Sequence, residues 1–361
     1  MIIGTMVVYQ QLRFIQNKNV GFDKEQVLIL HDTYLLGDKA KTFKGQVSNL
    51  TAVSSVTLAG YLPAGSSNNS TDGFLPENAD NNITPYRFTT YQVDEDYLKT
   101  LGIGLASGRN FSKTFGGDSA SVLINEAAAK QLGWKNPVGK RIRTIGNGTP
   151  ESKRFYTVVG VIRDFHFRSM HERIAPLVMF NGDDQYQMAA RIKTNNIPGL
   201  IKTLEKTWKA TSDNPFSYSF LNERFDKMYE SEQRVGKLFG IFAGLAVVIA
   251  CLGLFGLAAF TTIQRTKEIG VRKVLGASVL SIVSLLSKDF VKLVGIAIVI
   301  ASPLAWYGMN QWLSDFAYKV NIEWWVFLLA GVLAVSIALL TVSFQSIKAA
   351  LVNPVKSLRS E

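Results

Sequence analysis

The stretch Arg265–Ser278, RTKEIGVRKVLGAS, is a short cationic segment between two long apolar runs. Residues 238–264 before it carry no charge, and residues 293–314 after it are again uncharged. A bilayer core of about 30 Å is crossed by roughly 20 apolar residues in a helix, so both runs are long enough to span. A third uncharged run covers residues 324–347. The sequence therefore predicts three complete spans, at about 238–264, 291–313 and 324–347.

The segment between the first two runs is strongly basic. It contains Arg265, Lys267, Arg272 and Lys273 but only one acid, Glu268. Short loops rich in lysine and arginine stay on the cytoplasmic side of a membrane. The simplest interpretation is a topology anchor, which any membrane protein can have. The more specific hypothesis is a docking segment for a cytoplasmic partner.

The positive charge is concentrated next to the apolar segments. The net charge is +11, of which residues 21–230 contribute +3, residues 1–20 contribute +2 and residues 231–361 contribute +6. This distribution is typical of positive-inside anchoring and not of a basic groove for nucleic acid. Nucleic acid is therefore not expected among the partners.

The amino-terminal residues form a shorter apolar stretch. Residues 1–12, MIIGTMVVYQQL, would be about 18 Å long as a helix, which is too short to span. The stretch lacks the basic start and the small-residue cleavage site of a signal peptide. We interpret residues 1–20 as the outer end of a truncated first transmembrane helix. The chain is then expected to be a fragment of a longer permease, comprising its second half.

Residues 21–230 have the pattern of a large extracytoplasmic domain. Strands and helices alternate without a long parallel βαβ pattern, which predicts an α+β fold. A long exposed loop is expected at 63–82, where Gly, Ser, Asn and Asp are dense. Strands are predicted at 27–30, 86–93 (with one buried face), 121–125 and 156–162, and helices at 94–101 and 198–210.

Two residues mark the ends of a short helix after the strand at 121–125. Asn125 can accept hydrogen bonds from the first free backbone N–H groups of that helix, and Gly133 is placed to end it. From Asn222 the pattern is helical without a break up to the apolar run, since Gly236 alone is tolerable in a long helix. The sequence therefore predicts a continuous helical stalk into residues 231–361, the α-helical transmembrane domain, which ends in a cytoplasmic tail at 348–361.

No catalytic constellation is recognised. His31, His166 and His171 lack the HExxH spacing, and each is interpreted as a surface or strand-end histidine. No phosphate-binding loop, dinucleotide fingerprint or GxSxG elbow occurs. The acids at 94–96 suit a helix start without any metal. The single cysteine, Cys251, permits neither an intrachain disulfide nor a cysteine-based metal site. We therefore expect no enzyme activity, cofactor or metal in this chain.

The combination of motifs closely resembles the MacB/FtsX-type permeases of ABC transporters. RTKEIGVRKVLGAS, the two following spans and the terminal NPVKSLR resemble the FtsX-like permease domain. GFDKEQVLIL, SVLINEAAAKQLGW, NPVGKRI and YTVVGVIRDFHF resemble blocks of the MacB-like periplasmic core domain. The resemblance covers essentially the whole chain. This sequence departs from the family pattern in two ways: its first helix is truncated, and it lacks an ATPase domain. Some relatives carry the ATPase domain fused to the permease, and others use a separate ATPase subunit.

The resemblance implies a function for the basic segment as a coupling helix. A cytoplasmic ABC ATPase, which binds ATP and Mg, would move this segment, and the motion would reach the extracytoplasmic domain by mechanotransmission for export or envelope remodelling. Ion pairs are expected between Arg265 and Glu268 and between Glu268 and Arg272. Ile269, Val271 and Leu275 would contact the ATPase, Gly276 would end the helix and Ser278 would cap the next one. The implied coupling residues are Arg265, Lys267, Glu268, Ile269, Gly270, Val271, Arg272, Lys273, Leu275 and Gly276.

The resemblance also implies location and partners. The chain would lie in the bacterial inner membrane as a multi-pass protein, with its large domain outside. Its partners would be the ATPase, membrane lipid, a second permease copy or the other half of the same permease, and an adaptor or outer-membrane protein. The alternative is a membrane-tethered sensor or receptor without transport activity, although the 17-residue tail from Gln345 is small for signalling. A third class is a membrane-anchored extracytoplasmic enzyme, against which the absence of a recognised catalytic constellation and the three predicted spans count. The sequence does not identify the transported substrate or the ATPase.

Overall fold

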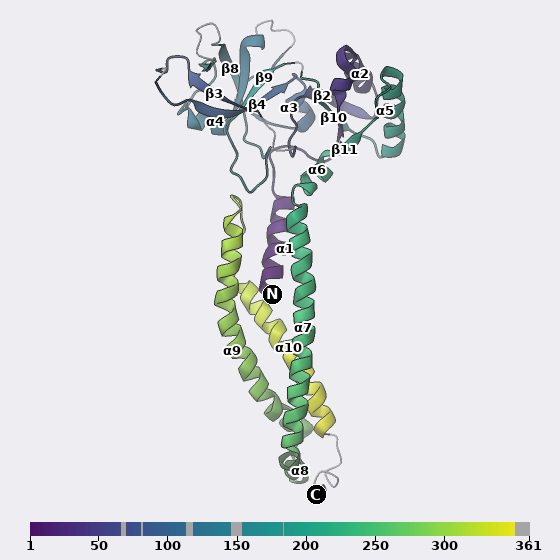
Figure 1. Ribbon diagram of the computed structural model, residues 1–361, viewed down its shortest axis with the longest axis vertical. Helices are drawn as coiled ribbons and strands as arrows, with labels where there is room; N and C mark the ends of the chain where they lie inside the picture. Colours follow the sequence, from purple (N-terminus) through teal and green to yellow (C-terminus); the bar gives the residue numbers. More distant parts are fainter. Residues whose placement is uncertain (66–69, 81, 113–117, 146–153, 183, 351–361) are drawn as a thin grey trace. The chain divides into compact units, whose positions relative to one another are not determined.

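The computed structural model describes residues 1–65, 70–80, 82–112, 118–145, 154–182 and 184–350. The chain divides into two compact units (Figure 1). The helical unit comprises Met1–Gln16 and Glu230–Glu361, and the globular unit comprises Asn17–Tyr229.

The helical unit is built from long helices. They are α1 (Ile2–Asn17), α7 (Glu230–Gln264), α8 (Thr266–Val274), α9 (Val279–Ser314) and α10 (Trp324–Ala350). Within the described residues, two helical stretches are long and apolar enough to cross a membrane, Glu230–Gln264 and Trp324–Ile347. These coincide with the first and third predicted spans. The second predicted span lies inside α9, a continuous helix of 36 residues that is not among the two.

The exposed surface of α7 is apolar. Ile241 is 67% exposed, Leu252 66% and Ile263 72%. A continuous apolar surface of this kind is unfavourable in water and is typical of contact with lipid or protein.

One buried polar side chain ties α1 to the segment after α9. Gln11 is fully buried; its Nε2 donates to the carbonyl of Tyr318 at 2.9 Å, and its Oε1 accepts the backbone N–H of Val320 at 2.8 Å. Both ends of the amide are therefore satisfied, as a buried amide requires. Val7 and Val8 of α1 pack beside it in one apolar cluster with residues of α9 and α10.

The globular unit contains a mixed sheet of eleven strands. The strands are β1 (Val27–Leu30), β2 (Val53–Ala59), β3 (Ser70–Pro76), β4 (Tyr86–Val93), β5 (Leu105–Gly108), β6 (Ser121–Asn125), β7 (Arg141–Thr144), β8 (Phe155–Ile162), β9 (Leu177–Asn181), β10 (Gln187–Ile192) and β11 (Tyr218–Phe220). The short helices are η1 (Thr33–Lys39), α2 (Ala40–Ser48), α3 (Tyr97–Leu101), η2 (Asp118–Ala120), α4 (Glu126–Gln131), α5 (Ile197–Thr211) and α6 (Leu221–Lys227).

The strand order gives this unit two cores. The order of ten strands is β11-β1-β10-β2-β4-β3-β7-β8-β6-β9, and the eleventh strand, β5, pairs with β8 beside this path. An additional parallel pairing of β4 with β9 closes six strands into a ring. The first core lies between the four strands β11, β1, β10 and β2 and helices α2 and α5 (Figure 1), where Phe43 meets Trp208 edge to face at 5.5 Å. The second belongs to the ring and includes Phe74 stacked on Phe88 at 5.6 Å.

Most of the predicted elements are confirmed, and two expectations about residues 63–93 are wrong. The strands at 27–30, 86–93, 121–125 and 156–162 and the helix at 198–210 are present to within one residue at each end. The expected loop at 63–82 contains β3, because the polar residues Ser70–Asp72 pair with β4; residues 66–69 and 81 lie outside the described part. β4 is buried on both faces from Phe88 to Tyr91, because it pairs with β2, β3 and β9 at the junction of the two cores.

The predicted continuous stalk is also wrong. α6 ends at Lys227 and α7 begins at Glu230. Tyr229, which lies between them, is 2% exposed, and its hydroxyl accepts the backbone N–H of Met170 at 2.9 Å. Its ring also contacts that of Phe225 at 5.4 Å. The helix breaks because this packing of Tyr229 in the globular unit is incompatible with a straight continuation of the chain.

Asn125 has the predicted capping role and one that the sequence did not indicate. Its Oδ1 accepts the N–H of Ala128 at 3.0 Å at the start of α4, and Gly133 has a φ of 68° at the other end of that helix. The same oxygen accepts the N–H of Leu177 at 2.8 Å, and Nδ2 donates to the carbonyl of Ala175 at 3.0 Å. Asn125 thus joins α4 to the start of β9.

We predict that Asn125→Ala destabilises the globular unit by about 2–4 kcal/mol, because it removes a helix cap and leaves buried backbone groups unsatisfied. The measurement is urea unfolding of residues 17–229 followed by tryptophan fluorescence. The matched control is Asn196→Ala, which removes only the cap of α5, a 3.0 Å bond from Gly199 at an exposed site. It should cost about 1 kcal/mol. Equal losses in the two variants would contradict the bridging role of Asn125.

His166 gives a pH-dependent prediction. The side chain is 6% exposed, and burial together with the positive charge of Lys18 lowers the pKa of His166 from 6.5 to about 4. Between these values the unfolded chain binds more protons than the native protein. The contribution of neutral His166 to the free energy of unfolding is therefore fully present above pH 6.5. It is lost as the pH falls towards about 4, and the free energy of unfolding then falls by on the order of 3 kcal/mol.

The measurement is the free energy of unfolding against pH for wild type, His166→Gln and the control His171→Gln. We expect the free energy of unfolding to change less steeply between pH 6.5 and 4 in His166→Gln than in wild type. The slope of His171→Gln should equal that of wild type. A slope unchanged by that substitution would show that His166 does not titrate in this way.

Candidate functional site

The basic segment forms a separate short helix between α7 and α9. Arg265 interrupts the helical dihedral angles at the end of α7, and α8 runs from Thr266 to Val274. The helix ends in a Schellman motif, in which Gly276 N–H donates to the carbonyl of Lys273 at 3.1 Å and Ala277 N–H to that of Arg272 at 2.9 Å. Gly276 has a φ of 88°, which only glycine adopts readily. This confirms the predicted helix end.

The turn leads directly into α9. Ser278 is the N-cap of α9, and its hydroxyl accepts the N–H of Ser281 at 3.3 Å, as predicted. Two well-defined caps within three residues fix the angle between α8 and α9. The segment is therefore a structured helical corner and not a flexible loop.

One apolar residue anchors α8 to α9. Ile269 is 7% exposed and packs against Ile282 and Leu286, both 2% exposed, with Ala277 at the edge of the cluster. Gly270 next to it is also buried. The expectation that Ile269 is a free contact for a partner is therefore wrong, because α9 already covers this side of α8.

The opposite side of α8 is exposed and apolar. Val271 is 50% exposed, Val274 66% and Leu275 80%. Their spacing of i, i+3 and i+4 is the pattern by which an amphipathic helix docks in a groove of another protein. Val271 and Leu275 were predicted as contacts from the sequence, whereas Val274 was not. The i, i+3 and i+4 spacing of Val271, Val274 and Leu275 is the sequence signal that indicates Val274 as a third contact.

The charged residues of α8 form one of the two predicted ion pairs. Glu268 and Arg272 lie 2.7 Å apart, and both are close to half exposed. Arg265 pairs instead with Asp289 of α9 at 3.4 Å, so the predicted Arg265–Glu268 pair is wrong. The reason is that Arg265 lies outside the regular turn of α8 and is directed towards α9. Exposed pairs of this kind contribute about 0–1 kcal/mol each, so they orient the segment more than they stabilise it.

The remaining charges favour the helix electrostatically. Arg272 and Lys273 lie in the last turn of α8 and Glu268 in the first turn, which matches the helix dipole at both ends. The side chain of Lys267 and the terminal NPVKSLR lie outside the described part. The contact of Asp289 with Arg265 joins residues 24 positions apart, and no local pattern in the sequence indicates it.

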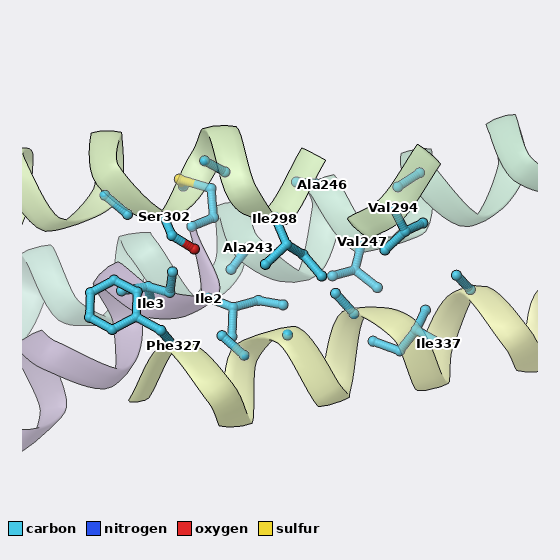
Figure 2. A pocket seen from close by; sticks show the side chains of 18 of the residues that line it. Ile2, Ile3, Ala243, Ala246, Val247, Val294, Ile298, Ser302, Phe327 and Ile337 are labelled. Carbon is cyan, nitrogen blue, oxygen red and sulfur yellow. The ribbon is translucent and has the colours of Figure 1, made fainter. Parts of the chain in front are cut away.

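An apolar cavity of about 350 Å³ lies between α1, α7, α9 and α10 (Figure 2). Alanines and branched aliphatic residues line most of it, and Ile298 of α9 points into the space between the helices. Ser302 supplies a hydroxyl to the lining and Cys251 a thiol, and no acidic or basic side chain is among the described lining residues. The cavity has the chemistry of a space filled by hydrocarbon and not that of an ion pathway.

Asp94 has a structural role. It accepts hydrogen bonds from the hydroxyl of Thr57 at 2.5 Å and the N–H of Leu58 at 2.7 Å, and it pairs with Lys44 at 2.8 Å. Burial raises the pKa of Asp94, and Lys44 opposes this. Across the described residues no group of three or more His, Cys, Asp or Glu side chains is arranged to hold a metal ion.

Two family models match the chain and identify its class. Residues 7–202 match the MacB-like periplasmic core domain, and residues 240–354 match the FtsX-like permease C-terminal domain. The chain therefore belongs to the MacB/FtsX-type permease family of ABC transporters. The segment α8 lies within the FtsX-like match.

Curated relatives are similar at low identity. The uncharacterized ABC transporter permease YknZ of Bacillus subtilis (strain 168) is 21% identical over 295 residues, which are 76% of this chain and 70% of that protein. The macrolide export ATP-binding/permease protein MacB of Neisseria gonorrhoeae is 24% identical over 200 residues, 52% of this chain. The matched region spans only 30% of the length of that MacB protein.

Solved structures of periplasmic or extracellular domains are also similar. The periplasmic region of MacB from Actinobacillus actinomycetemcomitans is 17% identical and has a TM-score of 0.41, covering 60% of this chain and 97% of that one. The extracellular domain of the noncanonic ABC-type transporter YknZ from Gram-positive bacteria is 12% identical with a TM-score of 0.36, covering 58% and 93%. The family assignment depends on the two sequence matches.

The two sides of α8 give a testable difference in accessibility. In a Cys251→Ser background, we predict that a cysteine at Leu275 reacts rapidly with a water-soluble maleimide, because this position is 80% exposed. A cysteine at Ile269, which is 7% exposed, should react at least about tenfold more slowly. The measurement is the labelling rate in inside-out membrane vesicles and in intact cells.

Labelling of Leu275→Cys in vesicles but not in intact cells would place α8 on the cytoplasmic side. The opposite pattern would contradict the positive-inside topology. Equal rates at the two positions would contradict the packing of α8 on α9.

Proposed function

We propose that this protein is the permease subunit of a MacB/FtsX-type ABC system that transmits an ATP-driven conformational change to its globular unit. The observation that carries the proposal is the two-sided helix α8. One side is fixed to α9 by Ile269, and the other presents Val271, Val274 and Leu275. A partner that binds the exposed side would therefore move α9 together with α8.

The proposed partner is a separate cytoplasmic ABC ATPase, which binds and hydrolyses ATP with Mg. The exposed apolar side of α8 would enter a groove of the ATPase, and the Glu268–Arg272 pair lies beside it. No step of ATP chemistry is assigned to this chain. The family membership supports an ATPase partner, and the geometry of α8 supports the place where it binds.

The proposed topology has three spans formed by α7, α9 and α10, with α1 as the end of a first helix. The globular unit would lie outside the bacterial inner membrane, and α8 and the tail inside. The apolar exposed surface of α7 and the basic character of residues 265–278 support this orientation. A second permease copy, or the other half of the same permease, would complete the transporter, and an adaptor or outer-membrane protein could bind the globular unit. Movement of the globular unit on the extracytoplasmic side would serve export or envelope remodelling.

We predict that Glu268→Lys separates ATP hydrolysis from movement of the globular unit. The substitution replaces an exposed ion pair with like charges, which costs α8 about 0.4–1 kcal/mol, and it reverses the charge presented to the ATPase. The measurements are phosphate release and the distance between spin labels in the globular unit, with and without ATP, on the reconstituted complex.

The matched control is Glu205→Lys on α5, which breaks an equivalent i, i+4 pair with Lys209 at 2.6 Å in the globular unit. We expect ATP-dependent movement to be lost in Glu268→Lys and kept in Glu205→Lys. Normal movement in Glu268→Lys would remove Glu268 from the proposed function. Failure of wild type to bind or stimulate any ABC ATPase would favour the sensor or receptor alternative.

A further inference from the structure

The globular unit contains a second, polar cavity of about 230 Å³. It lies among the segment after β2, the segment before β10 and helix α6. Since one water molecule occupies about 30 Å³, this space equals roughly eight waters. A ligand of this size would be comparable to an amino acid or a very short peptide.

Arg224 supplies a positive charge to this cavity. Its Nε donates to the carbonyl of Ala64 at 2.9 Å, and its Nη1 donates to Oε1 of Gln187 at 2.8 Å. Both acceptors are neutral, and no described acidic side chain forms an ion pair with this guanidinium. Partial burial of the guanidinium lowers the pKa of Arg224. Arg224 is partly buried, and a partly buried guanidinium without an anionic partner is available to an anionic ligand.

Asp184 supplies a negative charge to the same cavity. Its Oδ1 accepts the backbone N–H of Tyr186 at 3.2 Å, and no described basic side chain forms an ion pair with it. The cavity thus contains one cation and one anion that do not neutralise each other. Two charges held apart in this way are complementary to a ligand that carries both.

Two glycines bring the backbone close to these charged groups. A Cβ atom at Gly65 would lie 2.5 Å from Nη2 of Arg224, and a Cβ at Gly60 would lie 2.1 Å from Oδ2 of Asp184. Either side chain would have to displace the charged group beside it. Glycine at both positions therefore leaves room for the guanidinium and the carboxylate at the cavity.

Stacked tyrosines support the walls. Tyr61 stacks on Tyr91 and Tyr186 stacks on Tyr34, each with ring centroids 5.3 Å apart. Rings held by stacking change rotamer less readily than single exposed side chains. The buried ring of Tyr91, which is 1% exposed, holds Tyr61 in the wall, and a wall residue that is ordered before binding raises affinity because less ordering is needed on binding.

We propose that this cavity binds a small zwitterion, with the carboxylate of the ligand on Arg224 and its ammonium group directed to Asp184. The ligand class is an amino acid or short peptide with free termini. This site is independent of α8 and of the proposed coupling to an ATPase.

The experiment is isothermal titration calorimetry on the full chain in detergent with glycylglycine as the probe. N-acetylglycylglycine lacks the ammonium group and glycylglycinamide lacks the carboxylate. Because hydrogen bonds to charged groups are the strong ones, we expect each blocked compound to bind about tenfold to a hundredfold more weakly than glycylglycine. Acetate is included to detect simple anion binding.

Single substitutions test which residue binds each charged group of the ligand. Arg224→Gln should weaken glycylglycine binding by a similar factor, whereas Lys227→Gln, an equal charge change at an exposed position of the same helix, should not. Asp184→Asn should weaken binding of glycylglycine but not of the N-acetyl compound. If Arg224→Gln lowers the thermal unfolding midpoint, Gly65→Ala serves instead, since its Cβ displaces Nη2 without changing charge.

Three results would overturn the proposal. The first is no saturable binding of glycylglycine at millimolar concentration. The second is binding that neither Arg224→Gln nor Gly65→Ala weakens. The third is acetate binding as tightly as glycylglycine, which would show a site for anions only.

Discussion

Burial of Ile269 against Ile282 and Leu286 is the contact on which the arrangement of α8 depends. Without this contact, α8, a nine-residue helix with a high charge density, would lose the apolar packing that holds it on α9. Short isolated helices are marginal in water, so this contact and the two caps at Gly276 and Ser278 together hold the segment in one conformation. The outward direction of Val271, Val274 and Leu275 then follows from helical geometry, because they lie on the other side from Ile269.

The same packing joins α8 to α9 at more than one point, as the proposed transmission of motion requires. α8 and α9 are joined by a capped corner, and the Arg265–Asp289 pair adds a second connection between them. The helices α6 and α7 are separated at Met228 and Tyr229, and Tyr229 is buried within the globular unit.

Much of this fold could be predicted from local patterns, and the errors come from contacts between distant residues. The capping roles of Asn125, Gly276 and Ser278 depend on neighbours within a few positions, and each was predicted correctly. β3 was missed because its polar residues are held by β4, and β4 was misjudged because three strands surround it. In the candidate site, the ion pair of Glu268 with Arg272 was local and predictable. The burial of Ile269 and the pairing of Arg265 both depend on α9, which the sequence alone does not place.

The central claim is that the exposed side of α8 binds an ABC ATPase, and photo-crosslinking in cells tests it most directly. A photoreactive amino acid at Leu275, which is 80% exposed, would be compared with one at Leu280, the 82% exposed residue beyond the corner on α9. The account predicts that mass spectrometry identifies an ABC ATPase subunit in the crosslinks from position 275 and much less from position 280. Crosslinks from position 275 to lipid or to other proteins, with no ATPase among them, would contradict it.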